Sequence, residues 1–214
     1  DIHHDLGVAL MILGRLEDAV QAFEQALALD QTFSETRRNL GLALAGLGKP
    51  VQALALLRQA LNELPGDAET MFGLGNTLMA LDDPEAADDW YSRALSADPA
   101  HAGAMNGLAT ALMAQGEWDL ARGWLEQAVA LGPENVQARI NLGTLLLSLG
   151  DVTEAQMQYE RAVADAPRMA AAWTHLGLVL EEKCSLEAAR QAYARGLELD
   201  GDDPENLHGL AGFL

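Results

Sequence analysis

The side chains that could do chemistry are few, and the densest group is a run of carboxylates in the first half of the chain. The run contains Asp82, Asp83, Glu85, Asp88 and Asp89. Carboxylate oxygens suit a hard cation such as Ca²⁺, but the run lacks the spacing of an EF-hand loop. Acidic residues are also expected at the start of a helix, where they face the positive end of its dipole. A helix start therefore explains the run better than a metal site does.

Other reactive groups are sparse. Asp1, His4 and Asp5 share one helix face and offer metal-ligand chemistry, but a terminal turn frays, so we expect no stable site there. The single cysteine, Cys184, excludes an intrachain disulfide and any zinc site built from several cysteines. The sequence shows no glycine-rich phosphate loop and no Ser, His and acid constellation. We therefore predict a protein that is not an enzyme and needs no cofactor.

The charge balance is strongly acidic, since 32 Asp and Glu against 13 Lys and Arg give a formal net charge of −19. Nucleic acid and anionic membrane surfaces attract clustered cations, so neither is an expected partner. No apolar run is long enough to cross a bilayer, which predicts no direct membrane insertion. We expect a soluble protein of the cytoplasm or periplasm, for which the net charge supplies solubility and favours basic partners. High Ala and Arg-rich, Lys-poor usage indicate a bacterial source.

The elements that must position any site follow from a repeat that runs through the chain without a slip. A leucine recurs every 34 residues, followed each time by Gly or Ala: Leu6, Leu40, Leu74, Leu108, Leu142, Leu176 and Leu210. Within one copy, Leu40, Leu44 and Leu47 have the spacing of one helix face. Ala53 and Leu57 begin a second helical pattern in the same copy. Each copy therefore predicts two helices.

A tight turn is predicted between the two helices of each copy. Glycine suits a left-handed residue that closes the first helix, and the turn position holds Gly14, Gly48, Asp82, Gly116, Gly150 and Cys184. Pro50 and Pro84 follow, where a second helix starts and needs no N–H donor. The ends of units are then marked by Pro65, Pro99, Pro133 and Pro167.

The repeated side chains predict how the hairpins pack. Small residues in both helices let the helix axes approach. Larger residues fill the space toward the next unit: Phe23, Leu57, Tyr91, Leu125, Tyr159 and Tyr193. One hairpin cannot bury its apolar face alone, whereas stacked hairpins bury a continuous core. The predicted fold class is an all-α solenoid.

The pattern resembles the tetratricopeptide repeat (TPR) family, whose units carry Leu-Gly, then Ala, an aromatic, Ala and a closing Pro. It is matched by "NLGLAL…A…L…A…LP" from Asn39 and "NLGTLL…A…Y…A…AP" from Asn141. The resemblance covers essentially the whole chain and implies a right-handed superhelical solenoid. Departures include Gln31 and Gly201 in place of the closing Pro, and a single Trp, Trp173, at the family's early tryptophan position.

We expect one TPR array over 1–214. Its repeats would be 1–33, 34–67, 68–101, 102–135, 136–169 and 170–203, with 204–214 as the first helix of a seventh repeat or a cap. Leu207, Leu210 and Leu214 on that last helix need covering. This predicts a fragment of a longer array, or self-association through the uncapped C-terminal helix.

The resemblance also implies that the first helices line a concave groove. The expected partner-binding residues are Arg38, Asn39, Phe72, Asn76, Met79, Asn106, Thr110, Met113, Ile140, Asn141, Thr144 and His175. Asn amides can bond a peptide backbone as donor and acceptor, and Met adapts to varied apolar partners. We therefore predict a protein–protein interaction scaffold that binds a basic or amphipathic peptide segment or helix. The alternative is that these residues only pack against their own second helices.

Other readings stay open. A clamp for a chaperone's terminal carboxylate needs fixed cations, and the groove has no Lys. An asparagine ladder, as in arrays attached to O-linked N-acetylglucosamine transferases, is mostly missing. A carrier of an apolar small molecule or lipid, and the substrate-recognition arm of a larger enzyme, are rival functions. A second surface is predicted along the second helices, unless its residues are partly buried between units: Leu56, Trp90 and Trp124.

Overall fold

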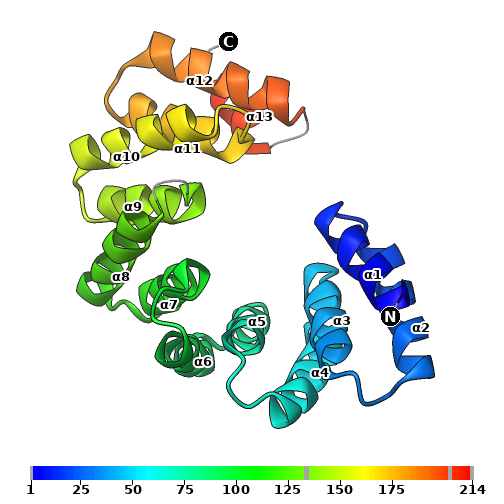
Figure 1. Cartoon of the computed structure of the whole chain (residues 1–214). Helices are drawn as coiled ribbons and strands as arrows, with labels where there is room; N and C mark the ends of the chain where they lie inside the picture. Colours follow the sequence, from blue (N-terminus) through cyan, green and yellow to red (C-terminus); the bar gives the residue numbers. More distant parts are fainter. Residues whose placement is uncertain (1, 133–134, 202–203, 213–214) are drawn as a thin grey trace. The chain divides into compact units, whose positions relative to one another are not determined.

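The computed structural model describes residues 2–132, 135–201 and 204–212, and every regular element in these ranges is an α-helix (Figure 1). The first helices of the hairpins are α1 (Ile2–Ile12), α3 (Ser34–Gly46), α5 (Ala68–Met79), α7 (Ala102–Gln115), α9 (Val136–Ser148), α11 (Ala170–Glu182) and α13 (Pro204–Ala211). The second helices are α2 (Leu16–Leu29), α4 (Pro50–Glu63), α6 (Pro84–Ala97), α8 (Trp118–Leu131), α10 (Val152–Asp165) and α12 (Leu186–Leu199). Asp1, Pro133 and Leu214 lie outside the described residues.

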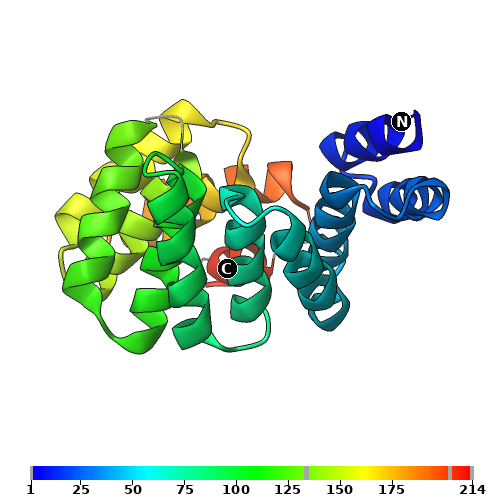
Figure 2. The ribbon, with the colours of Figure 1, turned by 60° about the horizontal axis from the view of Figure 1, so that its bottom comes forward.

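The helices form two compact units, Asp1–Gly116 and Glu117–Leu214. In the first unit, α1, α3, α5 and α7 contact one another in succession, and α2, α4 and α6 each contact the first helices before and after them (Figures 1 and 2). In the second unit, α9, α11 and α13 form the same succession, with α10 and α12 packed between them in chain order. The predicted all-α fold of stacked helix-turn-helix hairpins is confirmed within each unit.

The turn between the two helices of each hairpin has the predicted backbone. All six turn positions have positive φ: Gly14 (72°), Gly48 (69°), Asp82 (60°), Gly116 (81°), Gly150 (83°) and Cys184 (56°). The N–H after the turn residue donates back into the first helix, as from Lys49 to the Leu44 carbonyl at 3.0 Å. This bond closes the helix in the Schellman manner. Pro50 and Pro84 begin α4 and α6, as the sequence predicts.

The core follows the repeated rows. The alanines of the second helices, such as Ala53 and Ala60, are completely buried. Each of the larger residues that fill the space between units is at most 1% exposed: Phe23, Leu57, Tyr91, Leu125, Tyr159 and Tyr193. Leu6 is more exposed than the leucines at the same place in the middle repeats, with 48% of it exposed. It lies on α1, whose described contacts are with α2 and α3.

Tyr91 shows how one ring joins two hairpins. A Cβ added to Gly75 of its own hairpin would lie 2.5 Å from the ring's Cε1 atom. A Cβ added to Gly107 of the next hairpin would lie equally close to the same atom, at 2.5 Å. Real Cβ atoms do not approach so closely, so the ring can occupy this place only because both helices carry glycine there.

Candidate functional site

The first helices of the first unit enclose a small hollow between α3 and α5. Its volume is about 300 Å³, and its lining residues are Leu42, Ala45, Gly46, Gly73, Asn76 and Ala80. The wall is apolar except for Asn76, whose side chain is exposed. We call the surface that α3, α5 and α7 present here the first-helix face. Asn76 is the predicted partner-binding residue that reaches the hollow itself.

Asn76 is held by the tyrosine beneath it. The Tyr91 hydroxyl donates to Asn76 Oδ1 at 2.7 Å, which orients the amide at the edge of the hollow. Burial raises the pKa of the Tyr91 hydroxyl above its usual range, so this donor keeps its proton at neutral pH. The bond leaves the Nδ2 group of Asn76 able to donate to a ligand.

An aromatic group adjoins Asn76 on the same face. The Phe72 ring centroid lies 4.9 Å from that of His101 and 6.0 Å from that of Tyr91. His101 Nε2 lies 3.3 Å from the Glu69 carboxylate, while His101 Nδ1 accepts from the backbone N–H of Ala104. This arrangement places a half-buried apolar ring beside a carboxylate. It suits a partner that carries both apolar and basic groups.

Arg38 and Asn39 are engaged within the protein. Arg38 Nη1 lies 3.3 Å from the Asp67 carboxylate and its Nε donates to Asn39 Oδ1 at 3.2 Å. Asp67 caps α5 by accepting from the Thr70 N–H at 2.9 Å and from the Thr70 hydroxyl. Burial alone raises the pKa of Asp67, but these hydrogen bonds and Arg38 outweigh it, so the pKa is lowered. Asn39 is only 9% exposed.

The remaining predicted residues of this unit line the same side of α5 and α7. Met79, Asn106, Thr110 and Met113 are half-buried. The Thr110 hydroxyl donates to the Asn106 carbonyl at 2.9 Å, so it serves its own helix. The two methionines present apolar surface whose shape can adapt to a ligand.

In the second unit, the predicted residues lie around Tyr159. The Thr144 hydroxyl lies 3.1 Å from the Tyr159 hydroxyl, and the His175 ring centroid lies 5.5 Å from that of Tyr159. The pKa of Tyr159 is raised, because the effect of burial is larger than the opposite effect of its hydrogen bond with Thr144. Asn141 Oδ1 accepts from Gln137 at 3.1 Å. The side chains of Asn141, Thr144 and His175 are half-buried.

The structure buries two of the predicted groove residues, Asn39 and Ile140. Ile140 is 2% exposed, so it belongs to the core and not to a groove surface. Arg38 and Phe72 occupy the same place in earlier repeats, and their longer side chains reach the surface. A short branched side chain at this place stays beneath its neighbours, as the 1% exposure of Thr174 also shows.

The second predicted surface is half-buried. In the first unit, Leu56 packs against the buried core cluster, and the Arg93 guanidinium lies 4.6 Å from the Trp90 ring centroid. In the second unit, Trp124 is also half-buried. Neither unit therefore presents a bare aromatic ridge along its second helices.

Two residues of the acidic run near α6, Asp83 and Asp88, accept hydrogen bonds within their own helix. Asp83 caps α6 by accepting from the Ala86 N–H at 3.1 Å, and Asp88 accepts from Ser92 at 3.2 Å. His4 Nδ1 lies 2.8 Å from the Thr36 hydroxyl. Across the described ranges, no group of three or more His, Cys, Asp or Glu is arranged to hold a metal ion.

Among these residues, no helix combines the length and apolar character needed to span a membrane.

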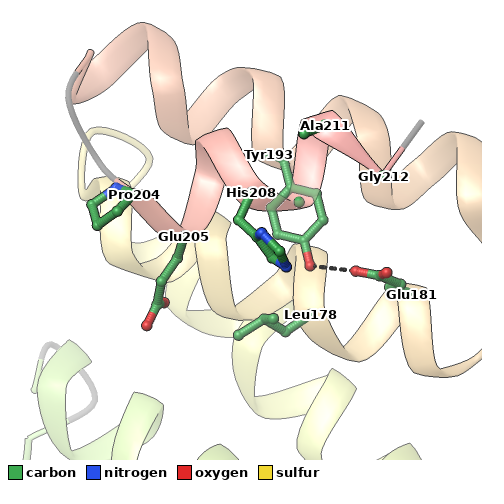
Figure 3. Close-up of a pocket in the computed structure, with 9 residues that line it drawn as sticks. Leu178, Glu181, Tyr193, Pro204, Glu205, His208, Ala211 and Gly212 are labelled. Atoms are coloured by element: carbon green, nitrogen blue, oxygen red, sulfur yellow. Dashed lines mark hydrogen bonds between the residues drawn. The ribbon is translucent and has the colours of Figure 1, made fainter. Parts of the chain in front are cut away.

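The second unit contains a cavity that the sequence did not predict. It lies between α11, α12 and α13 and has a volume of about 600 Å³ (Figure 3). The Tyr193 hydroxyl, which lines it, donates to Glu181 at 2.8 Å. A signal was available, because Gly209 stands at the place of Gly107, where glycine admits a tyrosine ring.

Comparison with known families gives a consistent result. A family model described as tetratricopeptide repeat matches residues 72–136 and 140–204, and another of that description matches residues 44–94. A model described as TPR repeat matches residues 7–48. No curated protein matches the chain.

Solved structures show the same fold. TTC0263, a thermophilic TPR protein of Thermus thermophilus, is 23% identical over 84% of this chain and 97% of its own, with a TM-score of 0.74. PilW, described as a widely conserved type IV pilus biogenesis factor, is 20% identical over 98% and 97%, with a TM-score of 0.83. YrrB, described as a TPR protein with an unusual peptide-binding site, is 25% identical over 91% and 100%, with a TM-score of 0.60.

Proposed function

Because this chain belongs to the tetratricopeptide repeat family, we propose that it is a non-catalytic scaffold or adaptor that binds a peptide segment or helix of another protein. Proteins of this family generally mediate protein–protein interactions. YrrB, which is similar to this chain, is described as having a peptide-binding site. The binding surface of the proposal is the first-helix face of the first unit, within an array of the repeat ranges given above.

The observation that carries the proposal is the hollow between α3 and α5 with Asn76 at its edge. A volume of about 300 Å³ is at the lower end of ligand pockets and suits one apolar side chain of a bound segment. The Nδ2 group of Asn76 can then donate to the carbonyl of that segment's backbone. Met79 and Phe72 lie on the same helix as Asn76 and are half-buried, so they can add apolar contact.

Charge supports a basic or amphipathic partner. The chain carries a formal net charge of −19, which steers cationic segments toward it. Glu69 lies beside Phe72 and His101 on this face, so a basic side chain next to an apolar one finds complementary groups.

The test is affinity capture from a lysate of the source organism, comparing the wild type with Asn76→Asp, Asn106→Asp, Met113→Glu. Asp at position 76 can still accept from Tyr91, so the variant keeps that contact and changes charge and donor capacity. We expect the variant to lose a protein that the wild type captures, with helicity by circular dichroism unchanged.

A matched control adds the same three negative charges to the exposed side of α4: Gln52→Glu, Gln59→Glu and Asn62→Asp. This control should capture the same proteins as the wild type. If the first-helix variant retains every captured protein, or the control loses the same ones, the first-helix face is not the binding surface.

A further inference from the structure

The cavity of the second unit has an apolar body with carboxylates at its edge. Leu178, Pro204 and Ala211 contribute apolar surface, and Glu181 and Glu205 contribute negative charge. None of the nine lining residues is Lys or Arg. In the view of Figure 3, Leu178 and His208 lie between the two carboxylates.

The cavity is built into the packing of the last three described helices. The Tyr193 ring is fully buried and passes between α11 and α13, where Gly177 and Gly209 leave room for it. A Cβ on Gly209 would lie 2.6 Å from ring atom Cε2. The ring therefore packs directly against α13, and both Tyr193 and residues of α13 line the cavity.

The cavity is electrostatically negative. The Tyr193 hydroxyl donates a hydrogen bond to the Glu181 carboxylate at 2.8 Å, which holds that carboxylate at the edge of the cavity. The pKa of Tyr193 is raised, first by burial, then by its hydrogen bond to Glu181 and by the charges of Glu181 and Glu205. Glu181 and Glu205 both line the cavity, so a cation that enters it is attracted by two carboxylates.

We propose that this cavity binds an arginine side chain carried by a basic segment of a partner protein. The proposal rests on the proposed function, since it takes the partner to be a protein, and it assigns a site separate from the first-helix face. An arginine has an apolar stem that can pack on Leu178 and Pro204. Its guanidinium carries five donors in a fixed plane, so it can bond carboxylates on two sides at once.

Size and charge together select this occupant. A volume of about 600 Å³ exceeds what a single hydrated ion needs and falls within the range of ligand pockets. A lysine ammonium is more strongly hydrated and lacks the planar fork that pairs with a carboxylate through two hydrogen bonds. A neutral apolar ligand would gain no charge attraction from Glu181 and Glu205, which are exposed at the edge of the cavity.

The proposal can be tested without knowing the partner, using N-acetyl-arginine N-methylamide as the probe. The probe is titrated into the whole chain while the backbone amide signals of His208, Gly209 and Gly212 are followed by NMR. We expect saturable shifts of these three signals. The matching lysine compound should bind more weakly, and the uncharged citrulline compound should produce no shift at the same concentrations. Equal shifts with all three compounds would overturn the proposal.

Charge-neutral variants locate the effect. Glu181→Gln, which still accepts from Tyr193, should raise the Kd of the arginine probe by about fivefold, and Glu205→Gln should do the same by a similar factor. Glu182→Gln makes the same charge change on α11 but does not line the cavity, so its Kd should match the wild type. If Glu182→Gln weakens binding as much as Glu181→Gln, net charge and not the cavity is responsible, and the proposal is wrong.

This outcome is separable from the proposed function. Loss of partner capture by the first-helix variant tests the first unit alone. If the arginine probe fails to shift the cavity signals while that capture result holds, the scaffold function stands and the arginine site does not.

Discussion

Asp82 and Cys184 occupy the same turn position in two repeats and share a left-handed backbone, with φ of 60° and 56°. The other four turns have glycine at this position, where such a backbone is unstrained. The cost to a residue with a Cβ is roughly 1–2 kcal/mol, and Asp bears it better than Cys because its side chain can bond locally.

The first prediction therefore concerns Cys184→Gly. We expect it to raise the free energy of unfolding by about 0.5–1 kcal/mol, since the relief of strain exceeds the extra chain entropy that glycine brings. Asp82→Gly should raise the free energy of unfolding by a smaller amount. Urea unfolding followed by circular dichroism measures both, and Gly150→Ala, the reverse change at an equivalent turn, should lose stability. A loss of stability in Cys184→Gly would contradict the strain argument.

The second prediction concerns Gly107→Ala. Alanine is a better helix former by about 1 kcal/mol, but its Cβ would lie 2.5 Å from Tyr91. Overpacking typically costs about 1–3 kcal/mol, so we expect a net loss of stability. The control is Gly123→Ala on α8, where an added Cβ has no atom within 4 Å and the helix preference acts alone. Thermal unfolding should show the two variants moving in opposite directions.

The third prediction concerns Asp67, which caps α5 and pairs with Arg38. Asp67→Ala should lower the free energy of unfolding by about 1–2 kcal/mol at neutral pH. Because the pKa of folded Asp67 lies below the unfolded value of 3.8, this contribution is present above that pH. It disappears as the pH falls through the folded value, where wild type and variant should converge. A stability difference that persists at acid pH would show that packing and not charge is responsible.

The fourth prediction concerns the three tyrosines of the chain, all of which have raised pKa values: Tyr91, Tyr159 and Tyr193. A group with a raised folded pKa contributes its full stability below its unfolded pKa, here 10.0. Stability should therefore fall as the pH rises above 10, where tyrosines of the unfolded chain ionise. In an alkaline titration, tyrosinate absorbance should appear only together with the loss of helicity. Ionisation of all three tyrosines in the folded state would refute the expectation.

Much of the fold follows from the period of the sequence. The left-handed backbone at Asp82 and Cys184 could be predicted because the repeat keeps both residues in register with glycines. The burial of Ile140 could not be predicted, because burial at that position depends on how far each side chain extends past its neighbours. The cavity beside Tyr193 was also missed, since it depends on how α13 packs against α11 and α12. The repeat gives no sign of the division into two compact units after Gly116.

The sharing of the Tyr91 ring by Gly75 and Gly107 has a consequence for how the first unit opens. The ring contacts belong to two adjacent hairpins, so neither hairpin can separate without exposing a surface that the other had covered. Opening should therefore spread from one hairpin to its neighbour, and amide hydrogens of α5 and α7 should exchange with solvent at similar rates. In this part of the chain, the side chain that sets the spacing between hairpins also makes their stabilities interdependent.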